Sequence, residues 1–120
     1  MKKILIINAN YYMKISSEMS SEAKNALDNS KSLGGKKKNF KYKIINVPGV
    51  FEIPVIISKN IKKYDGFIAL GCVIKGETPH FDFISQATTN AIMTLSIDYK
   101  KPIGNGIITC LNQDQAEARS

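Results

Sequence analysis

The sequence contains few of the residues that usually bind metals or attack substrates. Its 120 residues include two cysteines, one histidine, one arginine and no tryptophan. A single histidine and two cysteines without a Cys-x-x-Cys pair cannot form a typical zinc site. The cysteines, Cys72 and Cys110, lie in separate apolar stretches, and we predict two free, half-buried thiols rather than a disulfide.

Long hydrophobic stretches are also absent. No uninterrupted apolar run approaches the ~18 residues that a membrane-spanning helix needs. The first ten residues contain two lysines and a short apolar run at 4–7, but no small-residue cleavage site follows. We therefore predict a buried strand there rather than a signal peptide, and a cytoplasmic protein with one domain over residues 1–120. No membrane partner is expected.

The basic charge is almost entirely lysine. The formal net charge is +7, Arg119 is the single arginine, and six lysines fall within residues 31–43. Proteins that read nucleic-acid sequence depend strongly on arginine, whose planar fork contacts base edges. We therefore predict a solvated lysine-rich loop and no nucleic-acid partner.

Apolar runs of β-branched residues predict four strands, at 2–9, 40–47, 66–74 and 103–110. The run at 66–74 is apolar on both faces, which predicts a central strand, whereas lysines alternate with aromatics at 40–47, as near a sheet edge.

Helical spacing predicts helices between these strands. One follows a cap at Ser16 or Ser17, a second opens at Pro54, a third follows Thr78 and Pro79, and a fourth begins after residue 110. The expected buried positions of the first are Met19, Ala23, Ala26 and Leu27; those of the third are Phe81, Ile84, Ala87, Thr88, Ala91, Ile92 and Leu95.

Strands that alternate with helices predict an α/β fold, with a doubly wound parallel sheet and helices on both faces. Ligands bind such sheets outside the carboxyl ends of the strands. That edge would carry four loops, at residues 8–12, 47–52, 75–80 and 109–113.

Two of these loops contain candidate catalytic or ligand-binding groups. Before the third helix, the backbone N–H groups of Gly76, Glu77 and Thr78 could bind a phosphate, and His80 could exchange protons near neutral pH. An ordinary capped helix start would give the same pattern. Glu52 follows Phe51 in an apolar loop, where its carboxylate could accept hydrogen bonds from ligand hydroxyls or simply favour the start of a helix.

The sequence pattern alone leaves the roles of three further residues open. Tyr11 and Tyr12 could stack on a flat heterocycle or serve only in packing. Arg119 could pair with a phosphate or lie exposed near a frayed terminus.

The segments VPGVFEIP (47–54), ALGCVIKGETPHFDF (69–83) and GIITCLNQDQAEAR (106–119) together resemble the 6,7-dimethyl-8-ribityllumazine synthase family. The resemblance implies a flavodoxin-like three-layer fold and the penultimate step of riboflavin biosynthesis. In that reaction 5-amino-6-(D-ribitylamino)uracil condenses with 3,4-dihydroxy-2-butanone 4-phosphate, with release of phosphate and water. No metal or organic cofactor is implied.

The resemblance also implies roles for individual residues. His80 matches the proton-transfer histidine, and Gly76, Glu77, Thr78 and Arg119 match the phosphate-binding residues. Phe51 and Glu52 match residues that contact the ribityl chain, and Cys72, Val73 and Ile74 match the lining of the pyrimidine pocket. Tyr11 stands where the family usually has a stacking phenylalanine or tryptophan. Asn105 stands where the family usually has an aromatic residue that reaches the neighbouring subunit's site.

The family places its active sites between adjacent subunits, which implies a homopentamer or an icosahedral shell of pentamers and an association with riboflavin synthase. The sequence ends at Ser120, before a lysine-bearing segment and a last helix found in the family. We therefore expect a truncated last helix and reduced activity. A non-catalytic relative that binds a flavin or ribityl ligand is the alternative.

Overall fold

The computed structural model describes residues 2–29, 40–74, 80–110, 115 and 118, except for the side chains of His80 and Phe81. Its four strands are β1 (Lys2–Ala9), β2 (Phe40–Val47), β3 (Gly66–Ile74) and β4 (Ile103–Cys110). They form one parallel sheet in the order β2-β1-β3-β4, so the strands predicted from the apolar runs are confirmed, as are the edge position of β2 and the central position of β3.

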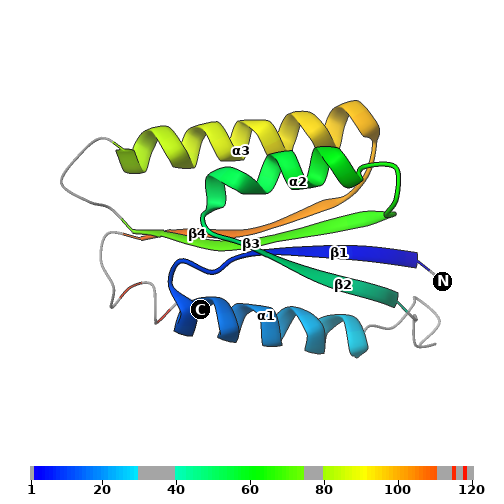
Figure 1. Cartoon of the computed structure of the whole chain (residues 1–120), viewed down its shortest axis with the longest axis horizontal. Helices are drawn as coiled ribbons and strands as arrows, with labels where there is room; N and C mark the ends of the chain where they lie inside the picture. The colour runs from blue at the N-terminus through cyan, green and yellow to red at the C-terminus, as the bar shows by residue number, and fades with distance from the viewer. Residues whose placement is uncertain (1, 30–39, 75–79, 111–114, 116–117, 119–120) are drawn as a thin grey trace.

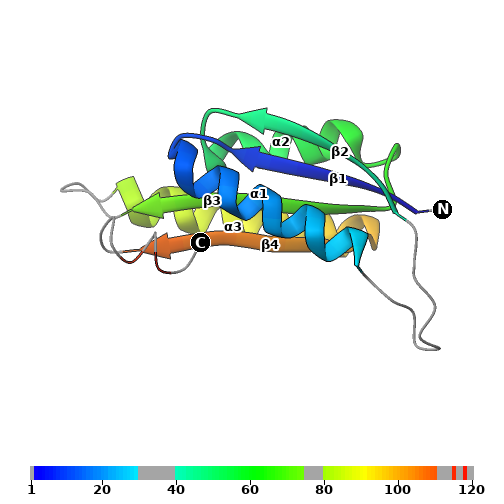
Figure 2. The ribbon, with the colours of Figure 1, turned by 90° about the horizontal axis from the view of Figure 1, so that it is seen from below.

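Helices cover both faces of the sheet (Figures 1 and 2). The helix α1 (Met13–Asp28) lies on one face, while α2 (Ile53–Asn60) and α3 (His80–Tyr99) lie on the other. This arrangement is the predicted flavodoxin-like three-layer α/β fold. Of the helix predicted after residue 110, the structure describes Gln115 and Ala118, and both are helical.

The alternation of side chains along β1 divides the core into two clusters. Leu5 and Ile7 point toward α2 and α3, whereas Ile6 points toward α1, and all three are fully buried. Burial of one such side chain is worth roughly 1.5–3 kcal/mol. A strand that is apolar on both faces is thus the natural centre of a three-layer fold.

The predicted start of α1 is wrong. The helix begins at Met13 after an N-cap at Tyr12, and Ser16 lies inside its first turn. The hydroxyl of the buried Ser16 donates a hydrogen bond to the Met13 carbonyl oxygen at 3.1 Å, so it does not cap the helix. The Asn8 side-chain amide also donates to the Ser16 carbonyl oxygen at 3.3 Å, which ties this turn to β1.

The predicted buried stripes are correct in part. Thr88 and Ile92 are buried in α3, but Ala87 is exposed, as is Ala26 in α1. Both alanines lie at the margins of their helix faces, where a small side chain does not reach the sheet. Within the part of the chain that the structure describes, no helix is long and apolar enough to span a membrane.

Candidate active site

A cleft of about 360 Å³ lies at the carboxyl ends of β1 and β3. The chain runs from β1 outward to β2 and then across β1 to β3, so this is the point where the strand order reverses. Such a reversal point is where open α/β sheets bind ligands. The cleft is lined by Tyr11, Tyr12, Gly49, Val50, Phe51, Glu52, Cys72, Val73, Ile74 and Ile84.

Six residues predicted from the sequence meet in this cleft, and they come from three separate segments of the chain. Tyr11 follows β1, Phe51 and Glu52 follow β2, and residues 72–74 form the end of β3. The Asn10 backbone N–H donates to the Val47 carbonyl oxygen at 2.9 Å, which ties the loop that carries Tyr11 to the end of β2.

A short 3-10 turn, η1 (Val50–Glu52), brings Phe51 and Glu52 to the cleft. The Glu52 backbone N–H closes the turn on the Gly49 carbonyl oxygen at 3.2 Å. Val50 is buried against Gly71 of β3, where a Cβ would lie 2.5 Å from Val50 Cγ1. The missing side chain of Gly71 therefore allows the turn to pack directly on the strand.

Phe51 and Glu52 remain exposed at the mouth of the cleft. Phe51 is 62% exposed, so its ring is available to a ligand or a partner subunit. Glu52 Oε2 lies 3.1 Å from the position that a Cβ of Gly49 would take, so the carboxylate folds back over its own turn. Among the described residues that line the cleft, Glu52 is the one carboxylate.

Two tyrosines form another wall. Tyr11 is 75% exposed and meets Tyr12 edge to face, with ring centroids 4.9 Å apart and an interplanar angle of 81°. Tyr12 packs against the core on the α1 side of the sheet. Burial, followed by the nearby Cys72 and Tyr11, raises the pKa of the Tyr12 phenol, so its hydroxyl is protonated at neutral pH.

Cys72 lies in the cleft wall as a neutral thiol. Burial raises its pKa to about 11, with further contributions from the charge of Cys110 and a hydrogen bond to that side chain. Because the thiolate is the reactive form, this cysteine is part of the wall rather than a nucleophile.

The prediction of free cysteines is confirmed, but the prediction that they are half-buried is wrong. Both cysteines are buried, because they belong to the apolar cluster between the sheet and α1. They also lie close together, since Ile74, two residues after Cys72, pairs with Cys110 on β4.

The predicted phosphate-binding residues Gly76, Glu77, Thr78 and Arg119 lie outside the described residues, as does the predicted cap at Thr78 and Pro79. His80 is the first residue of α3, and its side chain is not described. Its backbone lies one helical turn before Ile84, which lines the cleft. The backbone of α3 therefore begins at His80 near the rim of the cleft.

Asn105 is not in this cleft. It lies near the amino end of β4 beside a separate cavity of about 250 Å³, which is lined by Thr89, Ile92, Met93, Ser96, Ile97 and Ile103. Its side-chain oxygen Oδ1 accepts a hydrogen bond from the Ile107 backbone N–H at 3.0 Å. Within one chain, the structure therefore separates Asn105 from the other predicted site residues that it describes.

Tyr12, a seventh candidate that the sequence offered beside Tyr11 as a possible stacking residue, also lines the cleft. Gly49, Val50 and Ile84 line it too, although the sequence did not single them out as site residues. Gly49 and Val50 lie within two residues of Phe51, so proximity in the sequence was an available signal for both. Ile84 comes from α3, and only the folded arrangement brings that helix to the cleft.

Comparison with known proteins identifies the family of the chain. The family model described as 6,7-dimethyl-8-ribityllumazine synthase matches residues 1–120. The chain is 39% identical to a protein of that name from Bartonella tribocorum, with 98% of this chain and 74% of the relative aligned. Identity is 40% to the protein from Bartonella bacilliformis, at 98% and 74% coverage, and 39% to that from Agrobacterium fabrum, at 97% and 78%. The chain therefore belongs to the 6,7-dimethyl-8-ribityllumazine synthase family, the transferases of the penultimate step in riboflavin biosynthesis.

Proposed function

We propose that the cleft binds 5-amino-6-(D-ribitylamino)uracil and that the chain condenses it there with 3,4-dihydroxy-2-butanone 4-phosphate, releasing phosphate and water. The observation that carries this proposal is the convergence of six predicted site residues, from three distant segments, on one cleft at the strand-order reversal. A doubly wound sheet binds its ligands at this place.

The chemistry of the cleft suits the pyrimidine substrate. Val73 and Ile74, at the end of β3, supply apolar surface for a flat ring, and Tyr11 supplies an exposed aromatic ring. Glu52 supplies a carboxylate that can accept hydrogen bonds from the ribityl hydroxyls beside Phe51. These residues would bind and orient the substrate rather than react with it.

The phosphate substrate is assigned to the start of α3. In this proposal the N–H groups of Gly76, Glu77 and Thr78, together with Arg119, hold the phosphate. An α-helix of 20 residues begins directly after this segment, and the amino end of a helix favours an anion.

The proposed reaction needs positioning and proton transfer. The amine attacks the ketone, water leaves as the imine forms, phosphate is eliminated, and the ring closes with loss of a second water. His80 would move protons in these steps, which typically contributes 10²–10⁴-fold to a rate. Binding two small molecules in a reactive orientation would supply much of the remainder.

We also propose that the functional unit is a homopentamer, alone or within an icosahedral shell, located in the cytoplasm and able to associate with riboflavin synthase. Two observations support an assembly. The helices α2 and α3 expose several large apolar side chains, among them Val55, Phe83, Met93 and Ile97. Asn105 lies near the amino end of β4, away from the carboxyl edge of the sheet where the cleft lies. This is the position expected of a residue that contributes to the site of a neighbouring subunit.

The test of the proposed reaction is to mix the purified protein with both substrates and follow lumazine formation optically. We expect product above the uncatalysed background, and a rate at least 100-fold lower for His80→Ala. Arg119→Ala should mainly weaken binding of the phosphate substrate, whereas the exposed Lys24→Ala on α1 should change neither parameter.

A folded protein that binds the product but forms none above background would contradict the proposal. It would identify the chain as a binding-only relative of the family.

A further inference from the structure

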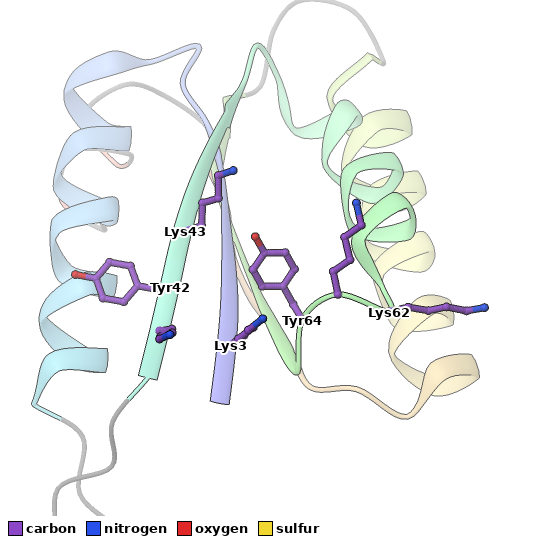
Figure 3. Close-up of a pocket in the computed structure, with 7 residues that line it drawn as sticks. Lys3, Tyr42, Lys43, Lys62 and Tyr64 are labelled. Carbon is purple, nitrogen blue, oxygen red and sulfur yellow. The ribbon is translucent and has the colours of Figure 1, made fainter. Parts of the chain in front are cut away.

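Another cavity lies at the opposite, amino-terminal end of the sheet (Figure 3). Its volume is about 640 Å³, and it is lined by Lys3, Lys41, Tyr42, Lys43, Lys62, Lys63 and Tyr64. None of these residues has a role in the proposed reaction. The cavity therefore requires a separate explanation.

The pairing of β1 with β2 gathers three of the lysines on one face of the sheet. Lys3 pairs with Lys41, and Leu5 pairs with Lys43, so all of these side chains share a face. It is the face that Leu5 buries under α2 and α3. Lys3, Lys41 and Lys43 are nevertheless exposed on it, toward the amino ends of the two strands.

The turn between α2 and β3 completes the cavity. It contributes Lys62, Lys63 and Tyr64, and Figure 3 shows Tyr64 among the lysines while Tyr42 points toward α1. The Lys101 ammonium donates hydrogen bonds to the carbonyl oxygens of Ile61 and Tyr64, which hold this turn in place. The Tyr64 ring packs against Phe67, with centroids 6.1 Å apart.

The charge of the cavity is positive. Among the described residues that line it are five lysines and no acidic side chain. The adjacent Asp65 accepts the Lys3 backbone N–H at 2.8 Å, and this bond and the charges of nearby lysines, Lys3 among them, lower the pKa of its carboxyl, so it offsets part of the positive charge. Like charges directly opposite on neighbouring strands, such as Lys3 and Lys41, destabilise a sheet, and a bound anion would relieve that repulsion.

We propose that this cavity binds a compact polyphosphate anion, such as the triphosphate group of a nucleotide. Lysine ammonium groups bind phosphate as point charges and do not need the planar geometry of arginine. The volume lies within the range of small-molecule pockets. The lysines line one cavity at the end of the sheet, which favours a compact ligand over a nucleic-acid strand, and Tyr64 offers a ring beside the phosphates.

Calorimetric titration of the full chain with inorganic triphosphate tests the proposal. We expect saturable binding at low salt, weakened at least tenfold in the double variant Lys41→Gln/Lys43→Gln. The control Lys24→Gln/Lys100→Gln removes the same charge from exposed lysines outside the cavity and should weaken binding less than twofold. Lumazine formation should be equal in all three proteins, which shows that each is folded independently of the anion result.

Two further titrations identify the source of the phosphates. Tighter binding of ATP than of inorganic triphosphate would assign a contact to the nucleoside, and Tyr64→Leu should then remove that difference. Equal binding would identify the triphosphate group alone as the ligand.

Several results would overturn the proposal. Equal weakening in the two double variants would reduce the effect to net charge. Absence of binding at low salt would exclude the site, and so would a single-stranded oligonucleotide that binds more tightly than triphosphate through the same lysines.

Discussion

At the scale of single residues, Glu52 is the side chain whose charge and position together favour recognition of a hydroxylated ligand. It is exposed at the mouth of the cleft, beside Phe51 and above Gly49. A hydrogen bond to a charged acceptor is worth about 1.5–3 kcal/mol, more than a bond between neutral groups. Replacing the carboxylate with an amide keeps the shape and removes this advantage.

We predict that Glu52→Gln raises KM for the ribityl substrate about tenfold, since 1.4 kcal/mol corresponds to a factor of ten. The KM for the phosphate substrate should stay within twofold. Steady-state kinetics with each substrate varied in turn measures both values. Glu22→Gln, an exposed carboxylate on α1, is the matched control, and an equal KM for wild type and Glu52→Gln would remove Glu52 from the site.

Cys72 shows how the environment decides whether a residue can react. The apolar cluster around it, which includes Ile6 and Leu70, disfavours the charged thiolate, and the Cys110 thiol adds to the effect. The pKa therefore rises from 9.0 to about 11. The folded state therefore holds the Cys72 proton more tightly than the unfolded chain does. The resulting contribution of Cys72 to the free energy of unfolding is present below pH 9.0 and is lost as the pH rises toward 11.

We predict that Cys72 of the native protein reacts with iodoacetamide at pH 8 at least tenfold more slowly than in the chain unfolded by denaturant. The native rate should continue to rise up to about pH 11, whereas the unfolded rate should level off near pH 9. Peptide mapping by mass spectrometry assigns the labelled residue. Rapid native labelling at neutral pH would show that the thiol is not shielded as the structure requires.

At the scale of elements, the contact between η1 and β3 determines the shape of the cleft. Val50 occupies the space over Gly71, and Ala9 lies close by on β1, 3.1 Å from the position of a Gly71 Cβ. Three elements therefore meet where a side chain is absent. A methyl group at this position would push the turn away from the strand and displace Phe51 and Glu52 with it.

We predict that Gly71→Ala lowers the free energy of unfolding by about 1–3 kcal/mol, the usual cost of overpacking, and weakens binding of the ribityl substrate. Val50→Ala in the same chain should restore part of both losses, because it vacates the contested space. Gly104→Ala is the control, since its Cβ would lie 3.8 Å from its nearest neighbour. Denaturant unfolding measures stability, and additive effects of the two substitutions would contradict this steric explanation.

The sequence predicts the strands well because each is a short apolar run between polar breaks, as at residues 66–74. It predicts the start of α1 poorly, because Ser16 can cap a helix or bond back within one, and only its burial against the sheet decides between the two. The turn η1 has no periodicity of its own. Its position depends on the fit of Val50 over Gly71, a contact between residues 21 positions apart.

The candidate site shows the same division between local and distant information. Residues in the segments that follow a strand, such as Tyr11 and Glu52, can be placed at the carboxyl edge of the sheet from the order of the elements. Ile84 cannot, because its place in the cleft depends on how α3 packs across the sheet.

At the scale of the whole molecule, α2 and α3 expose several large apolar side chains. Phe83 is 68% exposed, Ile97 is 66% exposed and Met93 is 57% exposed along α3. A shallow cavity of about 250 Å³, lined by Phe51, Pro54, Val55, Ala87, Thr88 and Ala91, lies between the two helices. Exposed apolar surface of this extent in a small protein indicates a protein–protein interface, and the proposed assembly would bury it.

We therefore predict that the protein sediments as an oligomer and that Ile97→Glu shifts it toward the monomer, because a carboxylate in an apolar interface would be desolvated without a partner. Asn25→Glu, on the exposed side of α1, introduces the same charge on the opposite face of the sheet and should leave the assembly unchanged. Sedimentation velocity over a range of concentrations measures both. If active sites form between subunits, the activity of Ile97→Glu should fall in parallel with the oligomeric fraction and recover at high protein concentration. A monomeric wild-type protein with full activity would show that one chain completes the site alone.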